Sequence, residues 1–264
     1  MRTYVNQSAF VGILWLASLS CLGQVQQSLP AHPAQPTQDG GVREVLESIV
    51  IPPIPHAPFT ATLATEATKY AADGATMTFV NERHIARDGQ GRIYEERWLL
   101  VPKGGNVKSS MNWIQLADPK QRTLYNCSPI RHICDLLVYE PASDLSAATV
   151  HPGSSRSLPK GDGNVAWEEL GNRNIVGIDT EGFRETTTIN AGTMGNDQPL
   201  TSLSEYWHSP QLGINLLSIR SSPFFGRQSF TITELTAAEP DPQLFELPAG
   251  YKVNDQRKNP PISQ

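Results

Sequence analysis

Apolar and polar residues alternate along most of the chain between Phe59 and Leu235, and a period of two is typical of β-strands. Phe59, Ala61 and Leu63 share one face of the first such segment, which ends at Asp73–Gly74, a dipeptide favoured in hairpin turns. Its partner strand contains Met77 and Phe79 and runs to about Ala86. The further expected strands are Ile93–Val101, Trp113–Leu116, Arg122–Asn126, Leu136–Tyr139, Val165–Leu170, Asn174–Ile178, Phe183–Ile189, Leu203–His208, Gly213–Arg220 and Gln228–Leu235.

Turn residues separate these segments. Asp88–Gly91, Asp118–Pro119, Gly171–Asn172 and Ser222–Gly226 each combine Gly, Pro, Asp, Asn or Ser between two apolar runs. Pro141–Asn164 is a longer stretch rich in Ser, Gly and Pro, and is expected to be a loop that divides the sheet into two halves. The pattern predicts one long antiparallel meander in a single domain.

A helical period occurs before the strands. Val42, Val45, Leu46 and Ile49 follow the i, i+3, i+4, i+7 spacing of a helix with one apolar face, and the prolines of Pro52–Pro55 end it. This short N-terminal helix needs an apolar surface to cover.

The N-terminus has the features of a secretory signal peptide. Arg2 precedes the apolar stretch Ala9–Leu19, which is shorter than the ~20 residues of a membrane span. We expect cleavage after Gly23 and therefore a periplasmic or secreted protein without a permanent span. The alternative is lipid anchoring at Cys21, which the polar Ser18 disfavours, because lipid-attachment sequences prefer a branched apolar residue there.

The expected organisation follows from composition. Residues 1–23 form the signal peptide, and residues 24–40, rich in Gln, Pro, Ala and Ser, form a flexible linker. Residues 41–255 form the β-rich domain, and residues 256–264 form a disordered tail.

Two cysteines remain after cleavage, Cys127 and Cys134. In an oxidising compartment an even pair is most simply a disulfide, and closing so short a loop is worth about 2.5 kcal/mol on the chain-entropy model. Alternatively, the two thiolates and His132 hold a metal ion, although the sequence places no fourth ligand.

Charge limits the partners. The formal net charge is −5, and the sequence has no basic run suited to a phosphate backbone or an anionic membrane surface. We therefore expect no nucleic-acid partner.

No arrangement of catalytic residues is visible. The histidines are scattered, no serine lies in a Gly-x-Ser-x-Gly elbow, and no glycine-rich phosphate loop opens a helix. Glu95–Glu96 and Glu168–Glu169 are adjacent pairs, but neighbours on a strand point to opposite faces. The sequence predicts neither a cofactor nor a metal site, and it does not favour an enzyme.

Four tryptophans fall on expected strands: Trp98, Trp113, Trp167 and Trp207. On a curved sheet they are candidates for an apolar ligand surface, and the alternative is ordinary core packing.

The C-terminal segment Glu239–Tyr251 and the phrase Gly177–Gly182 resemble uncharacterised exported proteins, many acidobacterial, that are similar to the LolA and RseB lipoprotein-carrier superfamily. This resemblance implies a mainly β (α+β) fold, with the meander curled into a half-open barrel and the short N-terminal helix covering its concave face. From the residues alone, Asp241 is expected to cap a helical turn beginning at Pro242.

Three functions remain. The first is binding of a lipid or another hydrophobic ligand in the half-barrel. The second is a periplasmic sensor or protein-interaction module that receives a strand or helix of a partner. The third, a hydrolase, ranks last because no nucleophile is arranged.

Overall fold

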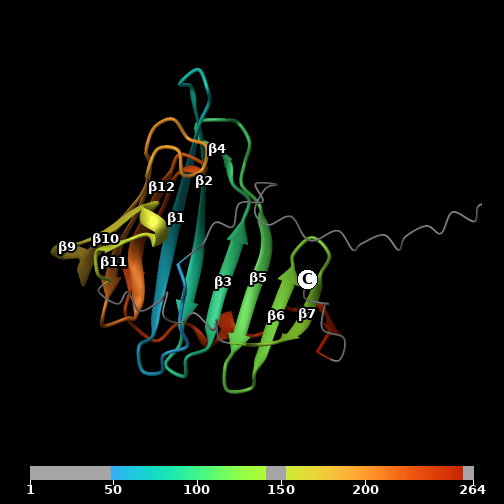
Figure 1. Ribbon diagram of the computed structural model, residues 1–264. Helices are drawn as coiled ribbons and strands as arrows, with labels where there is room; N and C mark the ends of the chain where they lie inside the picture. Colours follow the sequence, from blue (N-terminus) through green and yellow to red (C-terminus); the bar gives the residue numbers. More distant parts are fainter. Residues whose placement is uncertain (1–48, 141–152, 258–264) are drawn as a thin grey trace, which may run out of the picture. The chain divides into compact units, whose positions relative to one another are not determined.

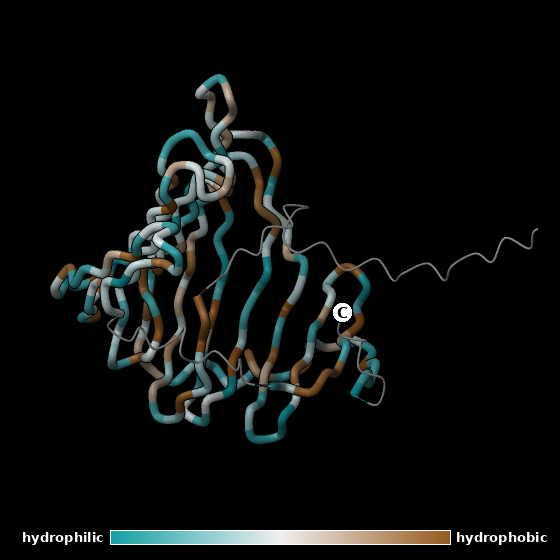
Figure 2. The backbone as a smooth tube through the Cα atoms, viewed as in Figure 1, coloured by the Kyte–Doolittle hydropathy of each residue, from teal (hydrophilic) through white to brown (hydrophobic). Residues whose placement is uncertain are grey.

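One β-sheet runs through the computed structural model, which describes residues 49–140 and 153–257 (Figure 1). Hydrophobic and hydrophilic positions alternate along its strands, as Figure 2 shows. The strands are β1 (Phe59–Tyr70), β2 (Thr76–Arg87), β3 (Ile93–Trp98), β4 (Val101–Pro102), β5 (Met111–Asp118), β6 (Thr123–Ser128), β7 (Ile133–Val138), β8 (Arg156–Ser157), β9 (Gly163–Ile175), β10 (Ile178–Ile189), β11 (Leu200–Ser209), β12 (Ile214–Ser222), β13 (Gly226–Thr236) and β14 (Lys252–Asp255).

The strand order differs from a single meander. It is β14-β7-β6-β5-β3-β2-β1-β13-β12-β11-β10-β9-β8, and β4 pairs with β2 beside this path. Two meanders are therefore joined at the centre by antiparallel pairing of β1 with β13, while β7 and β8, consecutive in the chain, lie toward opposite edges. The prediction of one continuous meander was wrong at this point, because local alternation carries no information on which distant strands pair.

The sheet curls toward one face and does not close. One cluster of buried apolar residues joins Ile93 of β3 to Ile175 and Ile178, although β3 lies far from β9 and β10 in the strand order. Such contacts require the sheet to bend toward the face that carries Phe59, Leu63, Ile85 and Ile93, which we call the inner face. The predicted mainly β, curled and unclosed sheet is confirmed.

Two short 3-10 helices are described, η1 (Pro159–Gly161) and η2 (Pro242–Phe245). The Asp241 carboxylate accepts a hydrogen bond of 2.9 Å from the backbone N–H of Gln243, so the predicted cap is confirmed. Leu244 and Phe245 pack against Tyr94 and Leu116 on the outer face of the sheet. Over the described residues, no helix has the length and apolar character needed to cross a membrane.

Several predictions fall outside the described residues. These are the signal peptide, the linker and residues 42–48 of the expected N-terminal helix; Ile49 itself lies in a segment without regular secondary structure, so the helix does not include it. All described residues belong to one compact unit. At its C-terminal end the backbone N–H of Gln256 donates to the Leu136 carbonyl at 2.9 Å, so order continues into the expected tail.

The predicted turn at Gly171–Asn172 was wrong. β9 passes through these residues, and the turn to β10 comes at Val176–Gly177. Gly171 has φ +79° and pairs with Gly182, while Glu169 pairs with Phe183, so Leu170 is the extra residue of a β-bulge. A glycine with positive φ suits both a turn and a bulge, and for this reason the local sequence did not separate them.

Candidate functional site

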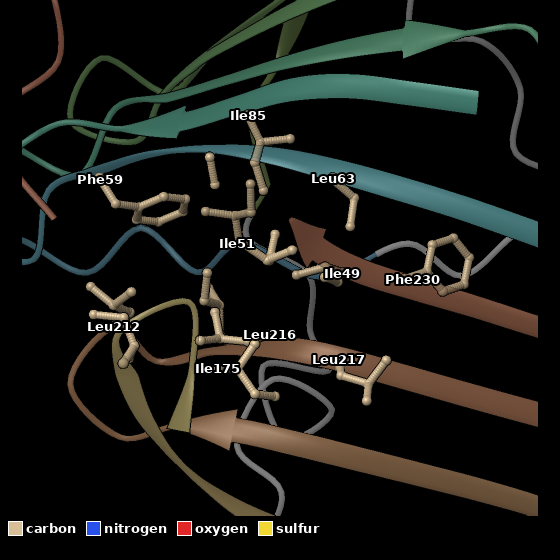
Figure 3. Packing of buried hydrophobic residues seen from close by; sticks show 14 of the residues in the cluster. Ile49, Ile51, Phe59, Leu63, Ile85, Ile175, Leu212, Leu216, Leu217 and Phe230 are labelled. Atoms are coloured by element: carbon tan, nitrogen blue, oxygen red, sulfur yellow. The ribbon is translucent and has the colours of Figure 1, made fainter. Parts of the chain in front are cut away.

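The inner face carries the main apolar cluster of the protein. Figure 3 shows Ile49 and Ile51 lying between the side chains of β1 and β2 and those of β12 and β9. Ile49 is 4% and Ile51 6% exposed, whereas Val50 between them is 38% exposed. An extended segment of the chain therefore lies on the inner face and buries alternate side chains there.

Arg87 holds the next residues of this segment, from Pro52 to Ala57, in place. Its guanidinium donates to the carbonyls of Pro52 (2.8 Å), Ala57 (2.7 and 3.0 Å) and Leu212 (2.6 Å). The group also lies over the Phe59 ring, 5.2 Å from its centroid. Burial lowers the pKa of Arg87 to about 10. Four hydrogen bonds compensate the desolvation of this buried cation, and they hold the segment against one end of the sheet.

A polar row crosses the inner face of the other half of the sheet. Glu95, Gln115, Asn126 and Asp135 are register partners in turn from β3 to β7. Gln115 donates to Asn126 at 2.9 Å, and Asn254 of β14 donates to Asp135 at 2.8 Å. The inner face is thus apolar around β1, β12 and β13, whereas around β5, β6 and β7 it carries polar side chains that are joined by hydrogen bonds.

A buried carboxylate lies on the outer face. Glu96 is 7% exposed and accepts from the Tyr94 hydroxyl (2.8 Å), the Trp98 indole N–H (2.7 Å) and the backbone N–H of His84 (3.1 Å). Burial and the Glu96 hydrogen bond raise the pKa of Tyr94 well above its ordinary value. The donors lie on β3, the strand of Glu96 itself, and on the neighbouring β2, so this network links the two strands.

Two of the open hollows among the described residues lie on the outer face. The larger has a volume of about 380 Å³ and is lined by Glu66, Glu82 and Ser229 among others. Lys103 pairs with Glu66 at 2.6 Å near this hollow. The second has a volume of about 220 Å³ and lies beside Phe245.

The adjacent carboxylates diverge as expected. Glu95 pairs with Arg97 at 2.9 Å on the inner face, whereas Glu96 lies on the outer face. Glu168 pairs with Arg184 at 3.0 Å. These carboxylates are held by neighbouring strand residues.

The predicted disulfide is confirmed. Cys127 and Cys134 are register partners on β6 and β7, are bonded to each other, and are both 0% exposed. Their sulfur atoms are therefore not thiolates available to a metal ion, and the His132 ring lies 5.1 Å from the Tyr251 ring. Over the described residues no group of three metal-binding side chains is present.

The structure does not bring the four candidate tryptophans together. Trp98 donates to Glu96 on the outer face, Trp113 lies under Arg131 at 5.4 Å, and Trp167 stacks on Phe183 at 5.7 Å. Of the four, Trp207 is the one that belongs to the main apolar cluster, and its indole donates to Glu205 at 2.9 Å. Their role in ligand binding stays a prediction. Ile49, which the sequence assigned to a helix, and Ile51, which it did not single out, mark the inner face more directly.

Solved structures with similar folds include MucB of Pseudomonas aeruginosa in complex with MucA, at 13% identity and a TM-score of 0.37, covering 75% of this chain and 58% of MucB. Others are the lipoprotein LppX of Mycobacterium tuberculosis (12% identity, 69% of this chain and 88% of LppX, TM-score 0.29) and a LolA superfamily protein of Nitrosomonas europaea (11%, 73% and 91%, TM-score 0.29). This chain spans less than two thirds of the length of MucB.

No family model and no curated protein matches the sequence. The comparisons give no support to the acidobacterial origin that the resemblance implied.

Proposed function

We propose that this chain is an exported, non-enzymatic binding protein that holds an apolar ligand, such as the acyl chain of a lipid, on the inner face of its curled sheet. The observation that carries the proposal is that a segment of the chain lies on that face and buries the side chains of Ile49 and Ile51 there. An extended apolar chain is already accommodated there, and an acyl chain presents the same kind of surface. The disulfide suits an oxidising compartment.

Competition for the inner face tests the proposal. A fluorescent fatty acid is titrated into the wild-type protein and into Ile49→Ser/Ile51→Ser. Because two serines bury much less apolar surface than two isoleucines, the segment is displaced more easily, and we expect the variant to bind the fatty acid about tenfold more tightly.

Val50 supplies the matched control. Its side chain lies between the two isoleucines but is 38% exposed, so Val50→Ser should leave the affinity for the fatty acid unchanged. Thermal unfolding of each variant confirms that it is folded. Absence of fatty-acid binding in both wild type and the double variant would contradict the proposal.

A second function is favoured by the nature of the observed occupant. The segment on the inner face is polypeptide, so the same face suits an apolar stretch of a protein partner. Native mass spectrometry of the protein isolated from cell envelopes distinguishes the two functions: a bound mass that organic solvent extracts supports a lipid, and a bound polypeptide supports a protein partner.

A further inference from the structure

Two polar side chains of the inner face are buried without satisfying their hydrogen-bonding atoms. Thr65 of β1 follows Leu63 by two residues on the same face, and its register partner on β2 is Asn81. Thr65 is 3% and Asn81 7% exposed. Among the described residues, neither Thr65 Oγ1 nor Asn81 Oδ1 has a hydrogen-bond partner. Such atoms are rare in folded proteins because burial without a partner is unfavourable, and here two of them lie on paired residues.

The Asn81 amide has a fixed orientation. Its Nδ2 atom donates to the carbonyl oxygen of Trp98 at 2.6 Å, so the Oδ1 atom is the part of the amide that is left to accept a hydrogen bond. The Thr65 hydroxyl both donates and accepts. The pair therefore offers one acceptor and, beside it, one group that is able to donate.

The pair lies at the boundary of the main apolar cluster. Phe230 of β13 is the register partner of Thr65, and it belongs to this cluster together with Leu63 and Ile49 (Figure 3). The other buried polar residues around the pair are Arg83, Ser218 and Gln228. A ligand whose apolar part lies along Leu63 and Phe230 would thus place its polar end at Thr65 and Asn81.

The length of the inner face suits such a ligand. Phe59 lies at the end of β1 that Arg87 holds, and Thr65 lies six residues further along the same strand. At the rise of an antiparallel strand the two residues are separated by roughly 20 Å, which accommodates a long acyl chain.

A hydroxyl group complements both atoms of the pair. Its hydrogen is donated to Asn81 Oδ1, and its oxygen accepts from Thr65 Oγ1. A carboxylate or phosphate oxygen would instead bring an acceptor against the Asn81 acceptor. We infer that Thr65 and Asn81 bind the hydroxyl group of an amphiphilic ligand, of the class of a monoacylglycerol, whose acyl chain lies on the apolar part of the inner face. This inference rests on the proposed function and names the polar end of its ligand.

A binding role for the Thr65 hydroxyl has a consequence for stability. Thr65→Val removes the hydroxyl and keeps the shape of the side chain, so without ligand the variant should be at least as stable to urea as wild type. Thr62 is the matched control on the same strand. It is 4% exposed on the outer face, and its hydroxyl donates to Glu234 at 3.2 Å, so Thr62→Val should be less stable than wild type.

Displacement of a fluorescent fatty acid measures the binding. The two competing ligands are 1-monolauroylglycerol and methyl laurate, which has the same acyl chain but no hydroxyl group. We expect wild type to bind monolauroylglycerol at least tenfold more tightly than methyl laurate. Thr65→Val should lose most of this preference through weaker binding of monolauroylglycerol alone, whereas Thr65→Ser, which keeps the hydroxyl, and Thr62→Val should retain it.

The outcomes separate this inference from the proposed function. Equal affinity of wild type for the two ligands, or an unchanged preference in Thr65→Val, would overturn the inference and leave the proposed function intact. A loss of stability in Thr65→Val as large as in Thr62→Val would also overturn it, because a buried water molecule would then satisfy the Thr65 hydroxyl. Binding of neither ligand, in wild type and in Ile49→Ser/Ile51→Ser, would contradict the proposed function itself.

Discussion

The guanidinium of Arg87 donates a hydrogen bond of 2.6 Å to the carbonyl oxygen of Leu212, 125 residues further along the chain. Arg87 ends β2, and Leu212 lies in the turn between β11 and β12, so this bond joins the two meanders at one end of the inner face. The same guanidinium holds Pro52 and Ala57. One buried cation thus links both halves of the sheet and the segment that lies on it.

Arg87→Met should therefore be strongly destabilising. The variant leaves three buried carbonyl groups without their donor, and each costs about 1–3 kcal/mol. We expect the free energy of unfolding, measured with urea, to fall by about 3 kcal/mol or more. Arg156→Met, at an exposed position of β8, should change it by less than about 0.5 kcal/mol. Equal stability of Arg87→Met and wild type would show that these bonds contribute little.

The disulfide makes a separate contribution to stability. Cys127→Ala/Cys134→Ala removes a covalent link between β6 and β7 that closes a loop of sequence separation 7. The unfolded chain gains entropy, so the free energy of unfolding should fall by about 2.5 kcal/mol. The wild-type protein unfolded with a reducing agent present should lose a similar amount. A reduced protein as stable as the oxidised one would contradict this.

Much of the sheet was predictable from the sequence, because strands and tight turns are local. The hairpin at Asp73–Gly74, the alternation of Glu95 and Glu96, and the cap at Asp241 all depend on residues a few positions apart. The pairing of β1 with β13 was not predictable, because their register depends on side chains about 170 residues apart. The alternation of apolar and polar residues along a strand indicates which face of the sheet a residue occupies, but it does not indicate which strand lies beside it.

The candidate binding surface was less accessible to sequence reasoning. Ile49 and Ile51 are buried on the inner face by tertiary contacts. The spacing of apolar residues in the sequence does not indicate these contacts, since Ile49 also fits a helical pattern.

The Glu96 network gives a prediction with a spectroscopic readout. Glu96→Gln keeps the size of the side chain but replaces one acceptor oxygen by an NH₂ group that faces hydrogen-bond donors. We expect a loss of about 1–3 kcal/mol in the free energy of unfolding. Because the Glu96 hydrogen bond and charge contribute to raising the pKa of Tyr94, that pKa should also fall toward its ordinary value.

Ultraviolet absorbance of tyrosinate, followed across the alkaline range, measures this shift. Glu82→Gln is the matched control, because Glu82 lies on the same face of neighbouring β2 but is exposed. It should leave both the stability and the tyrosine titration unchanged. A Tyr94 titration that is identical in Glu96→Gln and wild type would mean that burial alone sets the pKa.

His208 gives the stability a defined dependence on pH. Its ring is 9% exposed, and its Nδ1 atom lies 3.0 Å from the Asn215 side-chain oxygen. Burial lowers the pKa of His208 below 6.5, and this effect outweighs the opposing bond to Asn215 and the charge of Glu181. Below pH 6.5 the unfolded state therefore binds more protons than the folded state, and this contribution to stability decreases as the pH falls. Above pH 6.5 both states are neutral at this residue, and the contribution is constant.

His208→Gln should reduce the dependence on pH of the free energy of unfolding, measured with urea from about pH 8 to 5. His56→Asn, at an exposed position, should retain the wild-type slope. If His208→Gln and wild type lose stability in parallel below pH 6.5, another group controls the acid response.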